Sequence, residues 1–171
     1  MWIVDILRFY ISLDKKPFVG LYPSSDRTAS SESDIANRSL FLQMPNPEAA
    51  ILVIGDEILS GRTKDKNIGW LAEELTALGI SLKQARIIAD DRDTIIQTVR
   101  EFSKVFDYVF TSGGIGPTHD DITTEAVAAA FKVPVIRHPE AVARLTRHYE
   151  GTDIEFNAAR QKMADIPGGA E

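Results

Sequence analysis

The sequence predicts an α/β domain built on a parallel sheet, running from about Ala49 to the C-terminus. Three observations support this fold class. Residues 49–54 form a continuous apolar run, which suits a strand buried on both faces. Extended apolar segments then alternate with amphipathic segments of helical period, which is the pattern of right-handed βαβ units. A glycine-rich loop follows the third extended segment and leads into a helix.

The expected elements alternate along the chain. Strands are expected at 49–54, 81–88 and 108–111, with a short extended piece at 135–137. Helices are expected at 67–78, 93–106, 123–131, around 142–149, and at 156–164, and Gly79 ends the first of them. The aromatic side chains on these segments are expected to pack in the core: Trp70, Phe102, Phe106, Phe110 and Phe131.

Residues 1–47 do not share this pattern, and the serine-rich stretch 24–39 has no apolar period. We expect 1–47 to be a partly disordered extension and 48–171 to be the domain.

Composition narrows the possible functions. The chain has 171 residues, a net charge of -6 and no cysteine. Disulfides, thiolate catalysis and cysteine-ligated metal centres are therefore excluded, and a cytoplasmic location is expected. Without a basic cluster, binding to duplex nucleic acid is disfavoured. No apolar run approaches the ~20 residues of a membrane span, so a membrane-spanning segment is not expected. We therefore expect neither nucleic acid nor a membrane as a partner, the first because of the charge and the second because of the short apolar runs.

The glycine loop after the third strand is the strongest indication of a binding site. Its glycines, which permit positive φ and close approach of a ligand, are Gly113, Gly114 and Gly116. Their N–H groups and the following helix N-terminus favour an anion such as phosphate. Ser112 and Thr118 add hydroxyl donors, and His119 could contact a phosphate or relay a proton. The alternative is a plain strand–helix turn, since the spacing matches neither a P-loop nor a dinucleotide fingerprint.

Carboxylates follow the expected strands. Asp120 and Asp121 beside a phosphate site suggest Mg²⁺, although Asp121 could instead cap the helix beginning near Thr123. Asp90 and Asp91 follow the second strand, and either could be catalytic or could cap the next helix.

The loop after the first strand carries a second set of candidates. Asp56 and Glu57, between Gly55 and Gly61, could bind an amine-bearing heterocycle or a metal, or form an ordinary polar turn. Asn67 opens a helix, so capping is its default interpretation.

Taken together, the strings Gly55–Gly61 (GDEILSG), Asn67, Ala89–Asp91 and Ser112–Thr123 (SGGIGPTHDDIT) resemble the MoaB/Mog-type molybdopterin-binding domain family. They resemble most the CinA-like branch, whose domain also occurs at the front of some FAD synthases. The resemblance covers roughly 49–170. The chain ends where CinA-like proteins usually continue, so a C-terminally truncated domain is expected.

The resemblance implies a three-layer α/β/α sandwich with a central, mostly parallel sheet. It implies a pterin-phosphate or nucleotide bound at the glycine loop, Pro117 included, with Mg²⁺. Mog-type members bind molybdopterin and can adenylylate it in molybdenum cofactor biosynthesis. CinA-like members hydrolyse ADP-ribose or similar pyrophosphates with a metal.

By resemblance, Asp121 matches the functional aspartate after the glycine loop, and Asp90 or Asp91 matches the acidic residue after the second strand. The family tends to form homo-oligomers. A non-catalytic ligand-binding domain remains a third interpretation, since the same residues serve all three.

Overall fold

The computed structural model describes residues 45–170, so most of the expected extension 1–47 lies outside the described residues. The centre of the described fold is a parallel sheet with the strand order β2-β1-β3. Strand β1 spans Glu48–Ile54, β2 spans Ser81–Ile88 and β3 spans Tyr108–Ser112. Because β1 pairs with strands on both edges and is covered on both faces, its six residues 49–54 expose at most 2% of their surface. The predicted buried strand is confirmed.

The side chains of β1 alternate between two apolar clusters. Those of Ala50, Leu52 and Ile54 join one cluster, and those of Ala49, Ile51 and Val53 join the other. Successive side chains on a strand point to opposite faces, so a continuous apolar run is what a strand between two helical layers requires.

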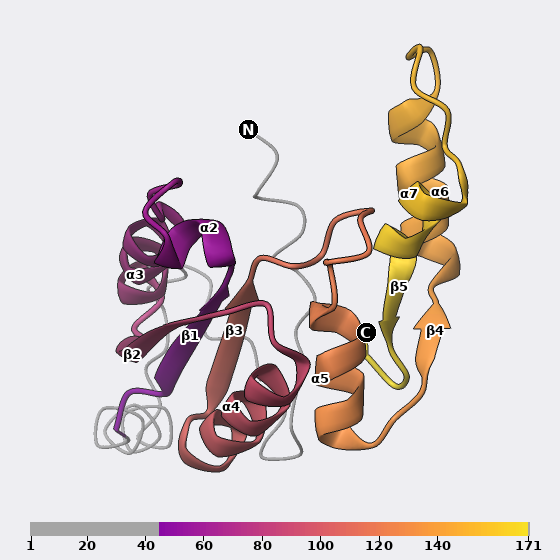
Figure 1. Cartoon of the computed structure of the whole chain (residues 1–171). Helices are drawn as coiled ribbons and strands as arrows, with labels where there is room; N and C mark the ends of the chain where they lie inside the picture. Colours follow the sequence, from indigo (N-terminus) through magenta and orange to yellow (C-terminus); the bar gives the residue numbers. More distant parts are fainter. Residues whose placement is uncertain (1–44, 171) are drawn as a thin grey trace, which may run out of the picture.

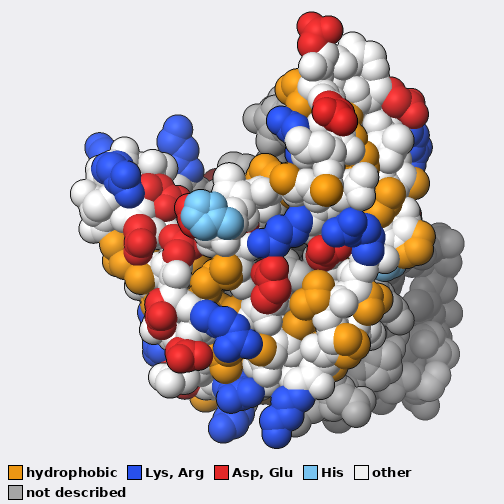
Figure 2. All heavy atoms as spheres, turned by 45° about the vertical axis from the view of Figure 1, so that its right-hand side comes forward, with side chains coloured by type: hydrophobic (Ala, Val, Ile, Leu, Met, Phe, Trp, Pro, Cys, Tyr) orange, Lys and Arg blue, Asp and Glu red, His pale blue; other side chains and the backbone are white. Residues whose placement is uncertain are grey.

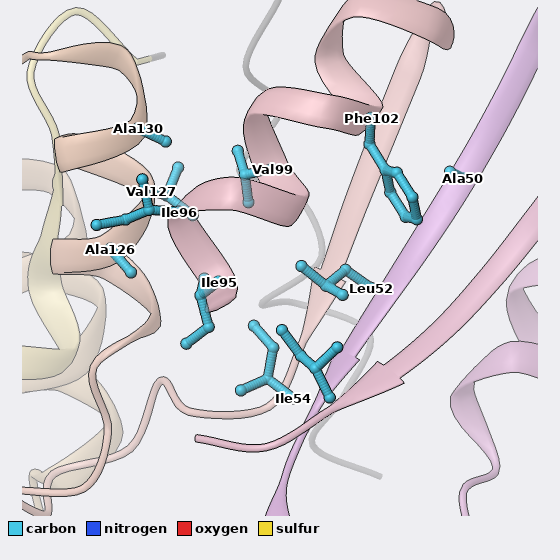
Figure 3. Close-up of a cluster of buried hydrophobic side chains, with 11 residues drawn as sticks. Ala50, Leu52, Ile54, Ile95, Ile96, Val99, Phe102, Ala126, Val127 and Ala130 are labelled. Atoms are coloured by element: carbon cyan, nitrogen blue, oxygen red, sulfur yellow. The ribbon is translucent and has the colours of Figure 1, made fainter. Parts of the chain in front are cut away.

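Helices supply the other half of each cluster. Helix α3, Asn67–Ala77, contributes Leu71 and Leu75 on one face. On the other face lie α4, Arg92–Val105, and α5, Thr123–Phe131 (Figure 3). These two faces make the three-layer α/β/α arrangement, and the predicted fold class is confirmed (Figure 1). We call residues 48–131 the sheet unit.

A smaller C-terminal unit, residues 134–167, packs against α5. It contains β4 at Val135–Arg137, α6 at Pro139–Tyr149, α7 at Ala158–Gln161, a 3₁₀ turn η1 at Lys162–Ala164, and β5 at Asp165–Pro167. β4 and β5 pair antiparallel in a sheet of their own. The predicted single helix over 156–164 is wrong in detail, because α7 gives way to η1 and then to β5.

Two other expectations need correction. Residues 56–59 form a short helix, α2 (Asp56–Leu59), where the sequence suggested only a loop. Trp70 was expected in the core but is 37% exposed, whereas Phe102 is 1% exposed and meets Phe106 edge-to-face at 5.5 Å between ring centroids.

Candidate functional site

The glycine loop begins where β3 passes the end of β1. Gly113 has φ 99°, and a Cβ placed on it would lie 1.9 Å from the Ile54 carbonyl oxygen. Gly114 has φ 63°, and a Cβ there would lie 2.3 Å from Thr123 Oγ1. Both positions are closed to any side chain, in conformation and in space. The loop backbone is therefore held against the end of β1.

Thr123, at the start of α5, fixes the same loop from its other side. Its hydroxyl donates to the Gly113 carbonyl oxygen at 2.9 Å, and its N–H donates to the Gly114 carbonyl oxygen at 3.0 Å. Thr123 is 2% exposed. The glycine loop thus leads into the N-terminus of a nine-residue helix, where N–H groups and the helix dipole favour an anion.

Asp90 is the point where three loops meet. One of its carboxylate oxygens accepts from the Asp56 N–H at 2.9 Å, and the other lies 3.5 Å from where a Cβ on Gly114 would be. The loops after β1, β2 and β3 are thereby brought together at the carboxyl edge of the sheet, as the parallel topology predicts. Asp90 faces this junction.

Asp91 caps a helix instead of facing this junction. Its carboxylate accepts from the Thr94 N–H at 2.8 Å and from the Thr94 hydroxyl, which makes it the N-cap of α4. These hydrogen bonds lower the pKa of Asp91. The capping alternative holds for Asp91, and Asp90 is the better match to a functional carboxylate.

The capping alternative is wrong for Asp121. The N-cap of α5 is Ile122, without a side-chain hydrogen bond. Asp121 Oδ2 instead accepts from the Thr118 N–H at 2.8 Å and from the Thr118 hydroxyl, and a Cβ on Gly116 would lie 2.7 Å from that oxygen. The carboxylate closes the end of the loop rather than the start of the helix.

Several effects act on the Asp121 carboxyl group. Partial burial raises its pKa, but hydrogen bonds from Thr118 and from the Gly116 N–H, with the positive charge of Lys162, outweigh burial and lower the pKa overall. Asp121 is therefore ionised at neutral pH, as a metal ligand must be.

Asn67 was expected to cap α3, and this is also wrong. The N-cap is Lys66, and Asp65 Oδ1 accepts from the Ile68 N–H at 2.9 Å. Asn67 Nδ2 donates to Ser112 Oγ at 2.6 Å across 45 residues of sequence. This bond ties the start of α3 to the end of β3.

The remaining candidates lie around this core. The Glu57 carboxylate folds over Gly55, with both oxygens 2.8 Å from where a Cβ would be, and Gly61 ends the loop with φ 74°. Pro117 is exposed in the glycine loop. His119 Nε2 lies 2.6 Å from Asp120 Oδ1, with side chains 94% and 71% exposed. His119 and Asp120 thus form a pair on the surface of the loop.

Sequence reasoning missed Lys162. Its Nζ donates to the Asp121 carbonyl oxygen at 2.7 Å and lies 3.2 Å from Glu125 Oε1. No local pattern identifies this residue, because it is 41 positions from Asp121 and reaches the loop only through the packing of the C-terminal unit.

The fit of a metal can be judged from the carboxylates. Within residues 45–170, no three His, Cys, Asp or Glu side chains gather as a metal-binding group. Mg²⁺ needs only one or two carboxylates when water and substrate phosphates complete its shell. Asp90 lies next to Gly114 and Asp121 next to Gly116, so each offers one carboxylate of this kind beside the glycine loop.

In the described part of the chain, residues 45–170, no helix is long and apolar enough to cross a membrane.

Comparison with known proteins adds independent information. The family described as "Probable molybdopterin binding domain" matches residues 50–168. A CinA-like protein of Anaeromyxobacter sp. strain K is 37% identical over 124 residues, which are 72% of this chain and 30% of that protein. A "Probable FAD synthase" of Caenorhabditis elegans is 51% identical over 132 residues, covering 70% of this chain and 25% of that protein.

Among solved structures, CinA of Thermoplasma acidophilum, described as of unknown function, is 33% identical with a TM-score of 0.64, and the match covers 73% of each chain. The chain spans only about a third of the length of the CinA-like proteins that it matches.

Proposed function

Because the chain belongs to the molybdopterin-binding domain family, in its CinA-like branch, we propose that its glycine loop binds the phosphate of a pterin-phosphate or a nucleotide, together with Mg²⁺. One observation carries the proposal. Gly113 and Gly114 adopt positive φ against backbone and the buried Thr123, whose hydroxyl and N–H bind their carbonyl oxygens, so the backbone whose N–H groups would bind the anion is held in place. A preformed set of donors binds an anion without first being ordered.

The carboxylates supply the metal side of the site. Asp90 and Asp121 would hold Mg²⁺, which neutralises charge on phosphate oxygens when bound. Asp90 is oriented by the Asp56 N–H, and Asp121 by Thr118. As a label for the domain we favour molybdopterin binding, with a role related to molybdenum cofactor assembly.

A second candidate is hydrolysis of a pyrophosphate such as ADP-ribose. In that reaction water attacks one phosphorus, the bridging P–O bond breaks, and two phosphate monoesters leave. The observation that favours it is Asp121, whose carboxylate is held beside the loop at Thr118 and Gly116, where it could hold metal or orient water. Catalysis would rest on positioning and electrostatics.

The test is calorimetric titration with ADP-ribose and with ATP, each with and without Mg²⁺, while phosphate-ester products are followed in the same samples. We expect metal-dependent binding by the natural chain, lost in Asp121→Asn and kept in Asp120→Asn. Cleavage of ADP-ribose would establish a pyrophosphatase. If folded protein neither binds nor cleaves ADP-ribose or ATP, nucleotide binding is contradicted. A pterin ligand or a non-catalytic domain would then be the remaining interpretations.

We also propose a cytoplasmic homo-oligomer without nucleic-acid or membrane partners. Aliphatic side chains stand on the surface of the C-terminal unit, where Val135, Ile136 and Ile154 are 39%, 41% and 49% exposed. Light scattering after size exclusion measures the assembly, and a monomer at all concentrations would contradict this part of the proposal.

A further inference from the structure

Lys162 joins the C-terminal unit to the glycine loop. It is the first residue of η1, and its ammonium group donates to the Asp121 carbonyl oxygen at 2.7 Å. The same group lies 3.2 Å from Glu125 Oε1, in the first turn of α5. The two side chains are only 28% and 41% exposed. Figure 2 views the side of the molecule where the C-terminal unit comes forward, and acidic and basic side chains lie close together there.

Glu125 depends on this contact. Its second oxygen, Oε2, is buried and has no hydrogen-bond partner among the described residues. The other oxygen, Oε1, lies beside Lys162, whose positive charge stabilises a carboxylate with one oxygen out of contact with water. Glu125 in turn keeps the ammonium group beside the end of the loop.

The contact at the Asp121 carbonyl lies at the end of the glycine loop, which is the proposed phosphate-binding segment. The Asp121 backbone holds the carboxylate that accepts from Thr118. The Thr123 hydrogen bonds fix the front of the loop at Gly113 and Gly114, whereas the back of the loop, 116–121, is exposed except at Gly116 and Asp121. Lys162 is thus the anchor for the back, as Thr123 is for the front.

We propose that Lys162 is a positioning residue for ligand binding: it holds the Asp121 end of the glycine loop against α5, with Glu125 as its counter-ion. The inference rests on the proposed function for its ligand, and on the contacts alone for its effect on the loop. A partly exposed ion pair adds little to global stability, so the effect should appear at the loop rather than in unfolding.

The first measurement needs no ligand. Amide hydrogen exchange over residues 113–122 is compared in the natural chain, Lys162→Met, Lys162→Arg and Lys83→Met. Lys83 is the matched control, since its 3.3 Å ion pair with Glu48 lies at the other end of the sheet. We expect faster exchange in Lys162→Met only, because arginine can still donate to both acceptors. Unchanged exchange in Lys162→Met would overturn the inference whatever the ligand is.

The second measurement is the affinity for ADP-ribose and ATP with Mg²⁺ in the same four proteins, alongside Tm. We expect Lys162→Met to weaken binding ~10-fold with a small change in Tm, and Lys162→Arg to restore most of it. Equal affinity in Lys162→Met and the natural chain would overturn the positioning role. If the natural chain binds neither nucleotide but exchange rises in Lys162→Met, nucleotide binding fails while the anchoring of the loop stands.

Discussion

The sheet unit and the C-terminal unit differ in how many of their side chains are buried. In the sheet unit, β1 is enclosed by two strands and two helical layers, and α4 alone buries five residues. In the C-terminal unit, the described residues of α6 include none that is buried, and all three residues of β4 are exposed. The contrast teaches that the sheet unit carries the stability, while the C-terminal unit acts through a few specific contacts.

Those contacts include both polar and apolar side chains. Arg137 of β4 forms a bidentate ion pair with Asp165 of β5, with N–O distances of 2.7 and 3.1 Å, which links the two strands. Ile166 of β5, the strand that packs against α5, is 3% exposed, and Ala164 of η1 is fully buried. Lys162 begins η1, just before these two residues, and its side chain reaches the glycine loop at the Asp121 carbonyl oxygen. The two units therefore differ in the size of their cores. They are in contact at the candidate site, where Lys162 of the C-terminal unit binds the glycine loop.

The largest expected effect is in the core of the sheet unit. Leu52→Ala should lower the free energy of unfolding by about 3 kcal/mol or more, because it leaves a cavity between β1 and the helices. Ile136→Ala, at a side chain 41% exposed in the C-terminal unit, should cost about 1 kcal/mol or less. Denaturant unfolding of both variants measures the two values, and comparable losses would contradict the contrast.

Gly113→Ala should have the next largest effect. The new Cβ would meet the Ile54 carbonyl oxygen, and φ 99° strains any side chain, so we expect a loss of about 2 kcal/mol or more together with loss of ligand binding. The control is Gly69→Ala in α3, where nothing lies within 4 Å of the new atom. That change should raise stability by about 0.5–1 kcal/mol. A harmless Gly113→Ala would mean that the loop is not held as described.

The smallest effect concerns pH. The folded-state pKa of Asp91 is lowered by its bonds to Thr94, so its stabilisation of α4 is fully present above the unfolded pKa of about 3.9. It is lost as pH falls through the folded pKa, which lies below that value. We expect the stability of the natural chain to fall toward that of Asp91→Asn as pH drops from about 5 to 3, in unfolding curves of both. A constant difference would rule out Asp91 as a titrating cap.

The sheet unit was also the better predicted region. Apolar runs and helical periods located β1, β2, α4 and α5 to within about two residues. In β1, α4 and α5 the pattern was strong because each of these elements buries several apolar side chains. In the C-terminal unit, β5 was missed. It has three residues, and its pairing with β4 arises from tertiary contact that no local pattern records.

The candidate site was predicted in composition but only partly in roles. The convergence of three loops followed from parallel topology. The partners of Asn67 and Asp90 did not, because their bonds span 45 and 34 residues, and neither did Lys162, which binds the Asp121 carbonyl oxygen across 41 residues. Asp and Asn after a strand suit both a cap and a site, and only the folded chain separates Asp91, a cap, from Asp90, at the junction.

Backbone amide NMR during titration tests most directly whether the glycine loop binds phosphate through its backbone N–H groups. With ADP-ribose or ATP and Mg²⁺, we predict the largest shifts at Gly113, Gly114 and Gly116. We predict none at Gly151, a positive-φ glycine of the C-terminal unit that serves as the internal control. Binding that shifts other amides and leaves these three unchanged would contradict the account.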